Sequence, residues 1–256
     1  MAVVSDKHQA VKVVARKDYA PDLWSIRVRG EEKLNFKPGQ YATLGVQSNG
    51  KIIERAYSIV SSPLEDEIEF FFELVPEGEL TPHIYDAREG NELTMRKQTK
   101  GLFTLDTKSG HKQHFLAATV TGVAPFVSMV RTMAREANQG NPPDAHLVLL
   151  QAASRSWEFA YRDELQALAE QHAWLDYVPT VSRPWEDAHW TGEIGRVEDV
   201  LRKYLDTLGL DPKDTTAYVC GHPQMIENAK GILARRGFTK EFVREEVYWV
   251  PKKEAK

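Results

Sequence analysis

Short runs of apolar or alternating apolar and polar residues fill the first part of the chain, with turn residues between them. Alternation with a period of two is the pattern of a half-buried strand. Turn segments such as Lys37-Pro38-Gly39 and Glu89-Gly90 end these runs. Six strands are predicted, at residues 11–15, 23–28, 41–46, 56–60, 68–75 and 92–96. Six short strands with one helical turn, expected at Thr81-Pro82, are typical of a small antiparallel β-barrel.

The pattern changes after about residue 110, where compact apolar runs alternate with segments of helical periodicity. Strands are predicted at 114–119, 145–152, 174–181 and 216–220, and helices at 125–138, 163–172 and 223–236. Such alternation predicts a doubly wound parallel sheet that binds its ligand at the carboxyl ends of the strands. The sequence therefore predicts two domains, a β-barrel at residues 1–108 and an α/β domain at 109–256.

Composition narrows the function classes. A length of 256 residues suits two domains, and a net charge of −4 lacks the basic character typical of nucleic-acid binding. No run is apolar enough for a signal peptide or a membrane span, so a cytoplasmic protein is expected. The single cysteine, Cys220, excludes an internal disulfide and an iron–sulfur cluster, and the scattered histidines give no metal-ligand spacing, so no metal is expected.

The segment Arg55-Ala56-Tyr57-Ser58 combines three useful chemistries in a predicted strand. The Arg55 guanidinium suits a pyrophosphate, the Tyr57 ring has a face for an isoalloxazine ring, and the Ser58 hydroxyl can bond to that ring's edge. The tetrapeptide taken alone is better explained as an ordinary strand with alternating faces.

The segment from Ala118 to Pro125 joins a predicted strand to a predicted helix. Its backbone amides and the helix N-terminus can receive a phosphate, which suits a dinucleotide. Because it contains a single glycine, Gly122, a plain strand-to-helix connection explains Thr121-Gly122 equally well.

Several motifs in one order resemble the ferredoxin–NADP reductase family, specifically its bacterial flavodoxin/ferredoxin–NADP reductase branch, over nearly the whole chain. The matching segments are Phe36, Gly39-Gln40-Tyr41, Arg55-Ala56-Tyr57-Ser58-Ile59, Val75-Pro76-x-Gly78-x-Leu80-Thr81, Gly101-x-Phe103, Thr121-Gly122-x-Ala124-Pro125-Phe126, Val181-Ser182-Arg183, Cys220-Gly221-x-Pro223-Gln224-Met225 and Glu246-Val247-Tyr248-Trp249. The resemblance implies an FAD-binding barrel followed by an NADP-binding α/β domain.

The resemblance also implies site residues. The FAD-binding residues would be Arg55, Ala56, Tyr57, Ser58, Gly78, Leu80 and Thr81, with Ser58 near the reactive flavin nitrogen. The NADP-binding residues would be Thr121, Gly122, Ser182 and Arg183, with Arg155 as a second arginine for the 2′-phosphate unless Ser154 takes that aligned position. A forked, permanently charged arginine suits a 2′-phosphate, whereas an acidic residue would be expected for NAD.

The C-terminal match supplies the remaining residues. Cys220 would lie beside the nicotinamide carbon that gives up hydride; it also fits a buried cysteine at a strand end, and both can be true. Glu246 would be the C-terminal acid, and Tyr248 with Trp249 would cover the flavin. Two departures from the family pattern stand out: Val120 replaces a glycine of the phosphate turn, and residues 250–256 extend beyond the usual chain end.

The implied activity is that of a ferredoxin (flavodoxin)–NADP reductase, an enzyme that moves electrons between NADPH and a separate one-electron carrier. The expected partner is a transiently bound, acidic ferredoxin or flavodoxin, steered to a monomeric reductase by a local basic face. Candidate cations for that face are Arg96, Lys97, Lys100, Arg131 and Arg135.

Three other functions stay open: an NAD(P)H-dependent reductase for an oxygenase or for free flavin, a flavin-containing regulatory or electron-transfer subunit, and a binding module without enzyme activity. Subunits of the second kind commonly carry a cysteine cluster, which the sequence lacks. A colourless purified protein would favour the third. The sequence leaves the physiological acceptor and the direction of electron flow undetermined.

Overall fold

The computed structural model describes residues 2–48 and 50–248. The chain divides into two compact units, which are described separately. Unit 1 contains the chain up to Thr104 together with Ala124–Arg135, and unit 2 contains Leu105–Val123 and the chain from Glu136 onward. Among the described residues, no helix is long and apolar enough to cross a membrane.

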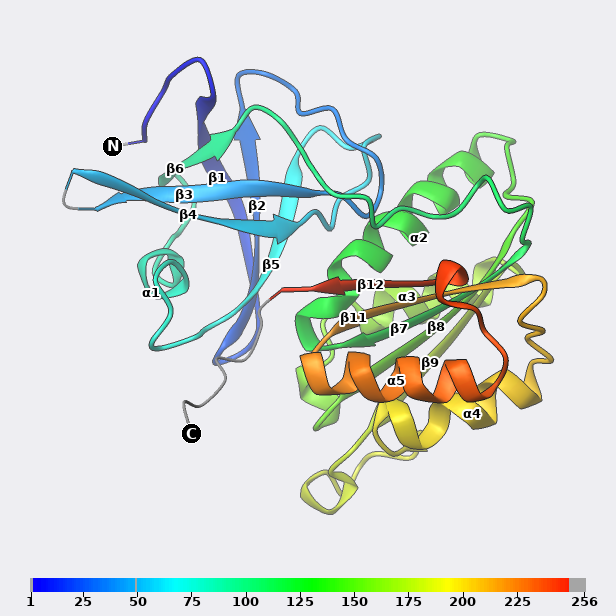
Figure 1. Ribbon diagram of the computed structural model, residues 1–256. Coiled ribbons are helices and arrows are strands. Elements are labelled where there is room, and N and C mark those ends of the chain that lie inside the picture. Colours follow the sequence, from blue (N-terminus) through cyan, green and yellow to red (C-terminus); the bar gives the residue numbers. More distant parts are fainter. Residues whose placement is uncertain (1, 49, 249–256) are drawn as a thin grey trace, which may run out of the picture. The chain divides into compact units, whose positions relative to one another are not determined.

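Unit 1 is built around a six-stranded antiparallel sheet with the order β4-β3-β6-β1-β2-β5 (Figure 1). Its elements are β1 (His8–Ala20), β2 (Leu23–Gly30), β3 (Tyr41–Ser48), β4 (Lys51–Ser58), β5 (Ile68–Glu73), α1 (Thr81–Ile84) and β6 (Glu92–Arg96). The two edge strands meet beyond Ser58, where Ile59 bridges Phe70 and the amide of Val60 donates to Glu69 O at 2.9 Å. This contact closes the sheet into a barrel, because it pairs the edges that would otherwise be open.

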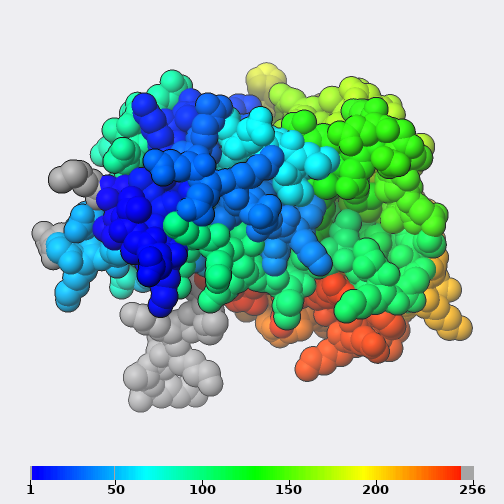
Figure 2. Space-filling model, turned by 90° about the horizontal axis from the view of Figure 1, so that it is seen from above, coloured from blue at the N-terminus to red at the C-terminus, as the bar shows by residue number. Residues whose placement is uncertain are grey.

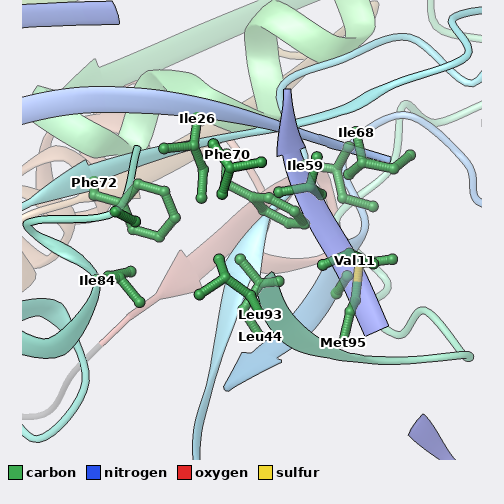
Figure 3. Close-up of a cluster of buried hydrophobic side chains, with 14 of the residues drawn as sticks. Val11, Ile26, Leu44, Ile59, Ile68, Phe70, Phe72, Ile84, Leu93 and Met95 are labelled. Atoms are coloured by element: carbon green, nitrogen blue, oxygen red, sulfur yellow. The ribbon is translucent and has the colours of Figure 1, made fainter. Parts of the chain in front are cut away.

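The core of the barrel consists of side chains that point inward from its strands. In Figure 3, Val11, Ile26, Phe70 and Leu93 point toward one another from β1, β2, β5 and β6. Ile84 of α1 covers one end of this cluster, and all five side chains are at most 4% exposed. The residues before β1 are mostly exposed, and their dark blue atoms lie on the surface of unit 1 in Figure 2.

Helix α2 (Ala124–Asn138) joins unit 1 through hydroxyl groups and an ion pair. Ser128 Oγ donates to Ser61 O at 2.7 Å, and Thr132 Oγ1 donates to Ser62 Oγ at 2.9 Å. Arg131 Nη1 lies 2.7 Å from Glu69 Oε2, and both side chains are nearly inaccessible. Because buried polar groups are costly unless they are paired, these bonds hold the helix against β5 and the connection that leads to it from β4.

Unit 2 is built around a six-stranded parallel sheet with the order β10-β9-β8-β7-β11-β12. Its strands are β7 (Gln113–Thr119), β8 (His146–Ala153), β9 (Leu175–Val181), β10 (Glu193–Ile194), β11 (Thr215–Gly221) and β12 (Val243–Val247). The chain runs outward from β7 to β10 and then returns to the other side of β7. The strand order therefore reverses between β7 and β11, which is where such sheets bind ligands, outside the carboxyl ends of the strands.

Helices cover this sheet. Helices α4 (Val197–Thr207) and α5 (Pro223–Arg235) lie side by side on one face (Figure 1), and α3 (Arg162–Gln171) packs against β9. Helix α4 was missed from the sequence, although its buried side chains recur at helical spacing. Those side chains are Val197, Val200, Leu201 and Leu205.

The predicted fold class, an antiparallel β-barrel domain followed by an α/β domain with a doubly wound parallel sheet, is confirmed. The predicted strand at 92–96 coincides with β6, and the helical turn at Thr81 is α1. The strand predicted at 56–60 was misplaced, because β4 already begins at Lys51 and ends at Ser58. Residues 51–55 pair with β3 from Leu44 to Ser48, and this cross-strand pairing decides where the strand starts.

Candidate functional site

The motif from Arg55 to Ser58 forms the end of β4, next to the point where the barrel closes. Arg55 and Ala56 are exposed, Tyr57 is half-buried and Ser58 is buried. The Tyr57 ring packs edge-on against Phe72, with centroids 4.7 Å apart, and burial raises the pKa of its hydroxyl to about 12. Tyr57 is thus a neutral aromatic surface held in one place at the strand end.

The second part of the barrel motif, from Gly78 to Thr81, lies beside the first. The Arg55 guanidinium forms an ion pair with Glu79, which brings the two segments together. Thr81 Oγ1 bonds to both backbone polar groups of Val75, and the Gly78 amide donates to Val75 O at 2.8 Å. The Thr81 hydroxyl therefore shapes the loop, and the buried Leu80 side chain belongs to the core cluster. Sequence reasoning missed Glu79, because its contact depends on the tertiary arrangement.

The turn after β7 carries Thr121 and Gly122 in a short 3₁₀ helix, Val120–Val123. A Cβ on Gly122 would lie 2.2 Å from Cys220 O, so no larger residue fits there without a backbone shift. Val120 has a φ of +44°, in the left-handed region that a β-branched residue rarely adopts. The departure noted in the sequence is therefore a strained position in the structure.

The ends of β7 and β11 are joined by a contact that the sequence motifs did not indicate. The His222 amide donates to Thr119 Oγ1 at 2.9 Å, across the point where the strand order reverses. Gly221 has a φ of +132°, and a Cβ there would lie 2.1 Å from Thr119 Oγ1. Close approach of two strand ends thus explains the glycine in the Cys220-Gly221 pair.

Three of the C-terminal candidate residues gather at the same edge of the sheet. Cys220 and Glu246 are register partners in β11 and β12. Tyr248 Oη donates to Thr121 O at 3.5 Å, which connects the end of β12 with the turn after β7. The thiol is fully buried, and its pKa is raised well above the usual value by burial first and by the Glu246 charge second, while a hydrogen bond with Tyr248 acts in the opposite direction.

The ends of β8 and β9 carry the other basic candidates. The amides of Ser182 and Arg183 donate to the carbonyls of Ala153 and Ser154, which continues the strand pairing past both strand ends. The Arg155 Nε donates to Glu186 Oε2 at 2.7 Å, and Arg183 Nη1 lies 3.8 Å from Glu186 Oε1. One carboxylate therefore draws the two arginines together, and Glu186 is a residue that sequence reasoning missed.

The candidates of unit 2 therefore share the carboxyl edge of one sheet. The arginines lie at β8 and β9, the glycine turn at β7, and Cys220 with Glu246 at β11 and β12. Four strand spacings separate β9 from β12, or about 19 Å, so an extended ligand can contact all of these positions.

Trp249 and residues 250–256 lie outside the described residues, so their expected roles stay predictions.

The two sets of side chains fit an FAD and a nicotinamide dinucleotide. Both include arginines for phosphate, and each has a tightly packed glycine turn beside exposed polar groups. Within residues 2–48 and 50–248, no group of three or more His, Cys, Asp or Glu side chains could hold a metal ion.

Two known protein families match this chain, one in its N-terminal part and one in its C-terminal part. A family described as an oxidoreductase FAD-binding domain matches residues 11–103, and one described as an oxidoreductase NAD-binding domain matches residues 116–231. The flavin and nicotinamide cofactors expected from the sequence are confirmed by these matches.

Individual proteins that are similar to this chain support the same family assignment. A ferredoxin–NADP reductase of Pseudomonas aeruginosa is 30% identical over 230 residues, which cover 82% of this chain and 83% of that protein. The ferredoxin–NAD(P)(+) reductase component of the naphthalene 1,2-dioxygenase system of Pseudomonas putida is 30% identical over 246 residues, covering 93% of this chain and 68% of that protein. The crystal structure of a ferredoxin NADP+ reductase from Neisseria gonorrhoeae with bound FAD and NADP has the same fold, with a TM-score of 0.81, 23% identity and coverage of 96% of this chain and 100% of that one. The chain belongs to the ferredoxin–NADP reductase family.

Proposed function

We propose that this chain is a ferredoxin (flavodoxin)–NADP reductase, which moves electrons between NADPH and a separate one-electron carrier. The observation that carries the proposal is the shared carboxyl edge of unit 2, where both arginines, the glycine turn and Cys220 with Glu246 lie along one line of strand ends. When bound, the flavin exchanges electrons in pairs with the nicotinamide and singly with the carrier.

The nicotinamide end of the site is assigned to Cys220, Glu246 and Tyr248. Burial keeps the Cys220 thiol protonated, so Cys220 contributes a neutral, buried side chain to this edge of the sheet. Glu246 places a carboxylate on the neighbouring strand, and Tyr248 presents a ring that is 38% exposed above the turn at Thr121. These groups bind and orient a flat ring, which is the main task of a protein in hydride transfer.

The phosphate contacts are assigned to the turn after β7 and to the two arginines. Gly122 lets the turn before α2 pack closely against Cys220, and the backbone amides of this turn are the proposed contacts for the pyrophosphate. Arg155 and Arg183, with the hydroxyl of Ser182 nearby in sequence, supply permanent charges for a 2′-phosphate. NADPH is therefore the proposed coenzyme.

The flavin contacts are assigned to unit 1. Arg55 neutralises the pyrophosphate, with Ala56 beside it, and the half-buried Tyr57 supports the ring. Ser58 lies at the buried end of the strand, where its hydroxyl would contact the ring edge. The Gly78–Thr81 loop approaches the same ligand through its backbone, because the Thr81 hydroxyl and the Leu80 side chain are engaged within the barrel.

A surface near the end of β4 suits an acidic electron carrier. Tyr41 pairs with Ser58 on one side and with Lys100 on the other, so Lys100 lies close to the proposed flavin residues. Leu102, two residues on, is 93% exposed. In the described part of the chain, Lys100 has no ion-pair partner, whereas the other four expected cations are paired with carboxylates. Those pairs are Arg96 with Glu54, Lys97 with Glu32, Arg131 with Glu69 and Arg135 with Glu65.

The proposed function is tested with purified protein in two steps. Its absorption spectrum and the nucleotide released on denaturation should identify FAD, and an FMN-only extract would contradict the flavin assignment. Anaerobic titration should then show reduction by NADPH in clear preference to NADH, followed by turnover with ferredoxin or flavodoxin. Failure to reduce either carrier while free FMN turns over would assign the chain to the flavin reductases instead.

A second candidate function follows from the similarity to the naphthalene dioxygenase reductase component. In that function the carrier would be the ferredoxin of an oxygenase, and the chemistry at both sites would be unchanged. Comparing turnover with a general ferredoxin and with an oxygenase ferredoxin separates the two. The boundary at residues 108 and 109, the monomeric state, the transient binding of the carrier and the cytoplasmic location remain part of this proposal.

A further inference from the structure

Glu186 contacts both arginines that the proposed function assigns to the 2′-phosphate. Its carboxylate accepts a hydrogen bond from Arg155 Nε at 2.7 Å and lies 3.8 Å from Arg183 Nη1. The two contacts use different oxygens of the same carboxylate. A single acidic side chain therefore forms ion pairs with two arginines, which come from the ends of β8 and β9.

The backbone that carries Glu186 is fixed. Glu186 ends the 3₁₀ helix Pro184–Glu186, and its amide donates to Arg183 O at 3.0 Å. The next residue, Asp187, is buried and accepts a hydrogen bond from the Ser156 amide at 2.9 Å. The Glu186 side chain is 36% exposed, so it can rotate into solvent while the turn stays in place.

We propose that Glu186 sets the choice between the two nicotinamide coenzymes, because it competes with the 2′-phosphate of NADPH for Arg155 and Arg183. This inference rests on the proposed function, in which those arginines bind the phosphate. A phosphate monoester and a carboxylate repel each other, so the two cannot share the guanidinium groups closely. NADH has a ribose hydroxyl in place of the phosphate, and a glutamate can accept a hydrogen bond from it. Glu186 therefore weakens NADPH binding and supports NADH binding.

The two arginines respond differently when Glu186 turns away. Arg155 keeps a second carboxylate partner, because its Nη1 lies 2.8 Å from Glu158 Oε1, and its guanidinium lies 5.8 Å from the Trp157 ring centroid. Glu186 is the ion-pair partner of Arg183 among the described residues. The competition therefore acts mainly through Arg183, and Arg155 stays oriented throughout.

The test uses the purified flavin-loaded protein and two small probes, 2′-phospho-AMP and 5′-AMP, whose binding is measured by titration calorimetry. Glu186→Gln removes the charge, and Glu186→Asp keeps it on a shorter side chain that cannot reach both arginines. The matched control is Glu241→Gln, which makes the same charge change beside the amino end of β12, at the opposite edge of the sheet.

Glu186→Gln should bind 2′-phospho-AMP about fivefold more tightly, as expected for the loss of an exposed ion pair, and the gain should shrink at high salt. Binding of 5′-AMP should not improve. The ratio of the NADH to the NADPH Michaelis constant should rise by a similar factor or more, Glu186→Asp should be intermediate, and Glu241→Gln should match the parent.

The proposal is overturned when Glu186→Gln binds 2′-phospho-AMP no better than the parent does. Arg183→Ala separates this failure from a failure of the proposed function. Weaker 2′-phospho-AMP binding in Arg183→Ala, with Glu186→Gln unchanged, leaves the phosphate site valid and removes only the role of Glu186. Unchanged binding in Arg183→Ala shows that the phosphate lies elsewhere, and both assignments then fall.

Discussion

Cys220 and Glu246 face each other as register partners on neighbouring parallel strands, with the thiol fully buried and the carboxylate half-buried. Both conditions oppose loss of the thiol proton, because burial and a nearby negative charge each disfavour a thiolate. Cys220, which the family resemblance places beside the nicotinamide, is therefore a neutral thiol and a poor nucleophile in this protein.

The folded protein should react negligibly with a thiol reagent such as Ellman's reagent at pH 8, because the reacting form is the thiolate and Cys220 is inaccessible. Unfolding in guanidinium should release one reactive thiol per chain, since the sequence has a single cysteine. Rapid labelling of the native protein at pH 8 would show that the thiol is open to solvent.

Replacement of Val120 by glycine should stabilise the turn after β7. The left-handed conformation costs an L-residue about 1–2 kcal/mol, and the flexibility of glycine costs about 0.5–1 kcal/mol, so a net gain of up to about 1.5 kcal/mol in unfolding free energy is expected. NADPH should also bind more tightly, because the backbone becomes more accessible. Urea denaturation and coenzyme titration measure the two effects.

Val120→Ala is the matched control for this change. It shortens the side chain but keeps a Cβ in the left-handed region, so it should recover little of the gain. Lower stability of the glycine variant than of the alanine variant would mean that Val120 packing outweighs its backbone strain.

Tyr248→Ser should strengthen NADP binding. The family resemblance implies that the Tyr248 ring covers the flavin face that the nicotinamide must reach, so without this ring the coenzyme would no longer have to displace it. Discrimination against NADH should weaken, and a longer-wavelength charge-transfer band should appear on mixing with coenzyme. Parent-like binding and spectra would make Tyr248 a packing residue that holds the Thr121 turn.

Acid should destabilise the fold through His114. This side chain is 2% exposed, and burial lowers its pKa from 6.5 to about 4. Asp106 and, least of all, Asp214 act in the opposite direction, whereas His111 and Arg244 lower the pKa further. The folded state disfavours the protonated imidazole, so its contribution to stability is complete above pH 6.5 and is lost as the pH falls toward 4. Between pH 7 and pH 5 the unfolding free energy should fall by about 2 kcal/mol from this residue.

Urea denaturation at both pH values measures that slope, and His114→Gln is the control. Glutamine stays neutral, so the variant should lose most of the difference between pH 7 and pH 5 even if it is less stable at both. An unchanged slope in the variant would assign the acid sensitivity to carboxylates.

Lys100→Glu should raise the Michaelis constant for an acidic carrier without changing NADPH oxidation by a small artificial acceptor. Among residues 2–48 and 50–248, Lys100 has no ion-pair partner, and it lies two residues before the exposed Leu102. In the proposed function it attracts the carrier, so charge reversal should replace attraction by repulsion, and the effect should diminish at high ionic strength. Lys112→Glu, at the start of the unit 2 sheet, carries the same charge change as a control. Equal effects of the two variants would indicate net charge rather than a docking surface.

Much of the fold could be predicted because period-two and helical patterns are local properties of the sequence. The helical spacing of Val197, Val200 and Leu201 in α4 is a local pattern of the same kind, but no recognised motif flanks it. The start of β4 was not readable, because it depends on pairing with β3.

The candidate site could be predicted where side chains follow strand ends, as with Thr121, Arg183 and Cys220. The carboxylates Glu79 and Glu186 could not, because each lies beside an arginine that is distant in sequence or belongs to another strand end. The left-handed conformation of Val120 was likewise hidden, since a valine gives no local signal for it.

The reversal of strand order in unit 2 also constrains how the protein matures during synthesis. Strand β7 emerges early, but its neighbour β11 and then β12 are made only after the whole excursion through β10. Pairing of such distant segments requires closure of a long loop, which makes it a late and slow event. A nascent chain that has formed β7, β8 and β9 would already hold Arg155 and Arg183, yet it would lack the half of the edge that receives the nicotinamide. The ability to discriminate a complete coenzyme from its adenosine fragment is therefore the last property that the folding chain acquires.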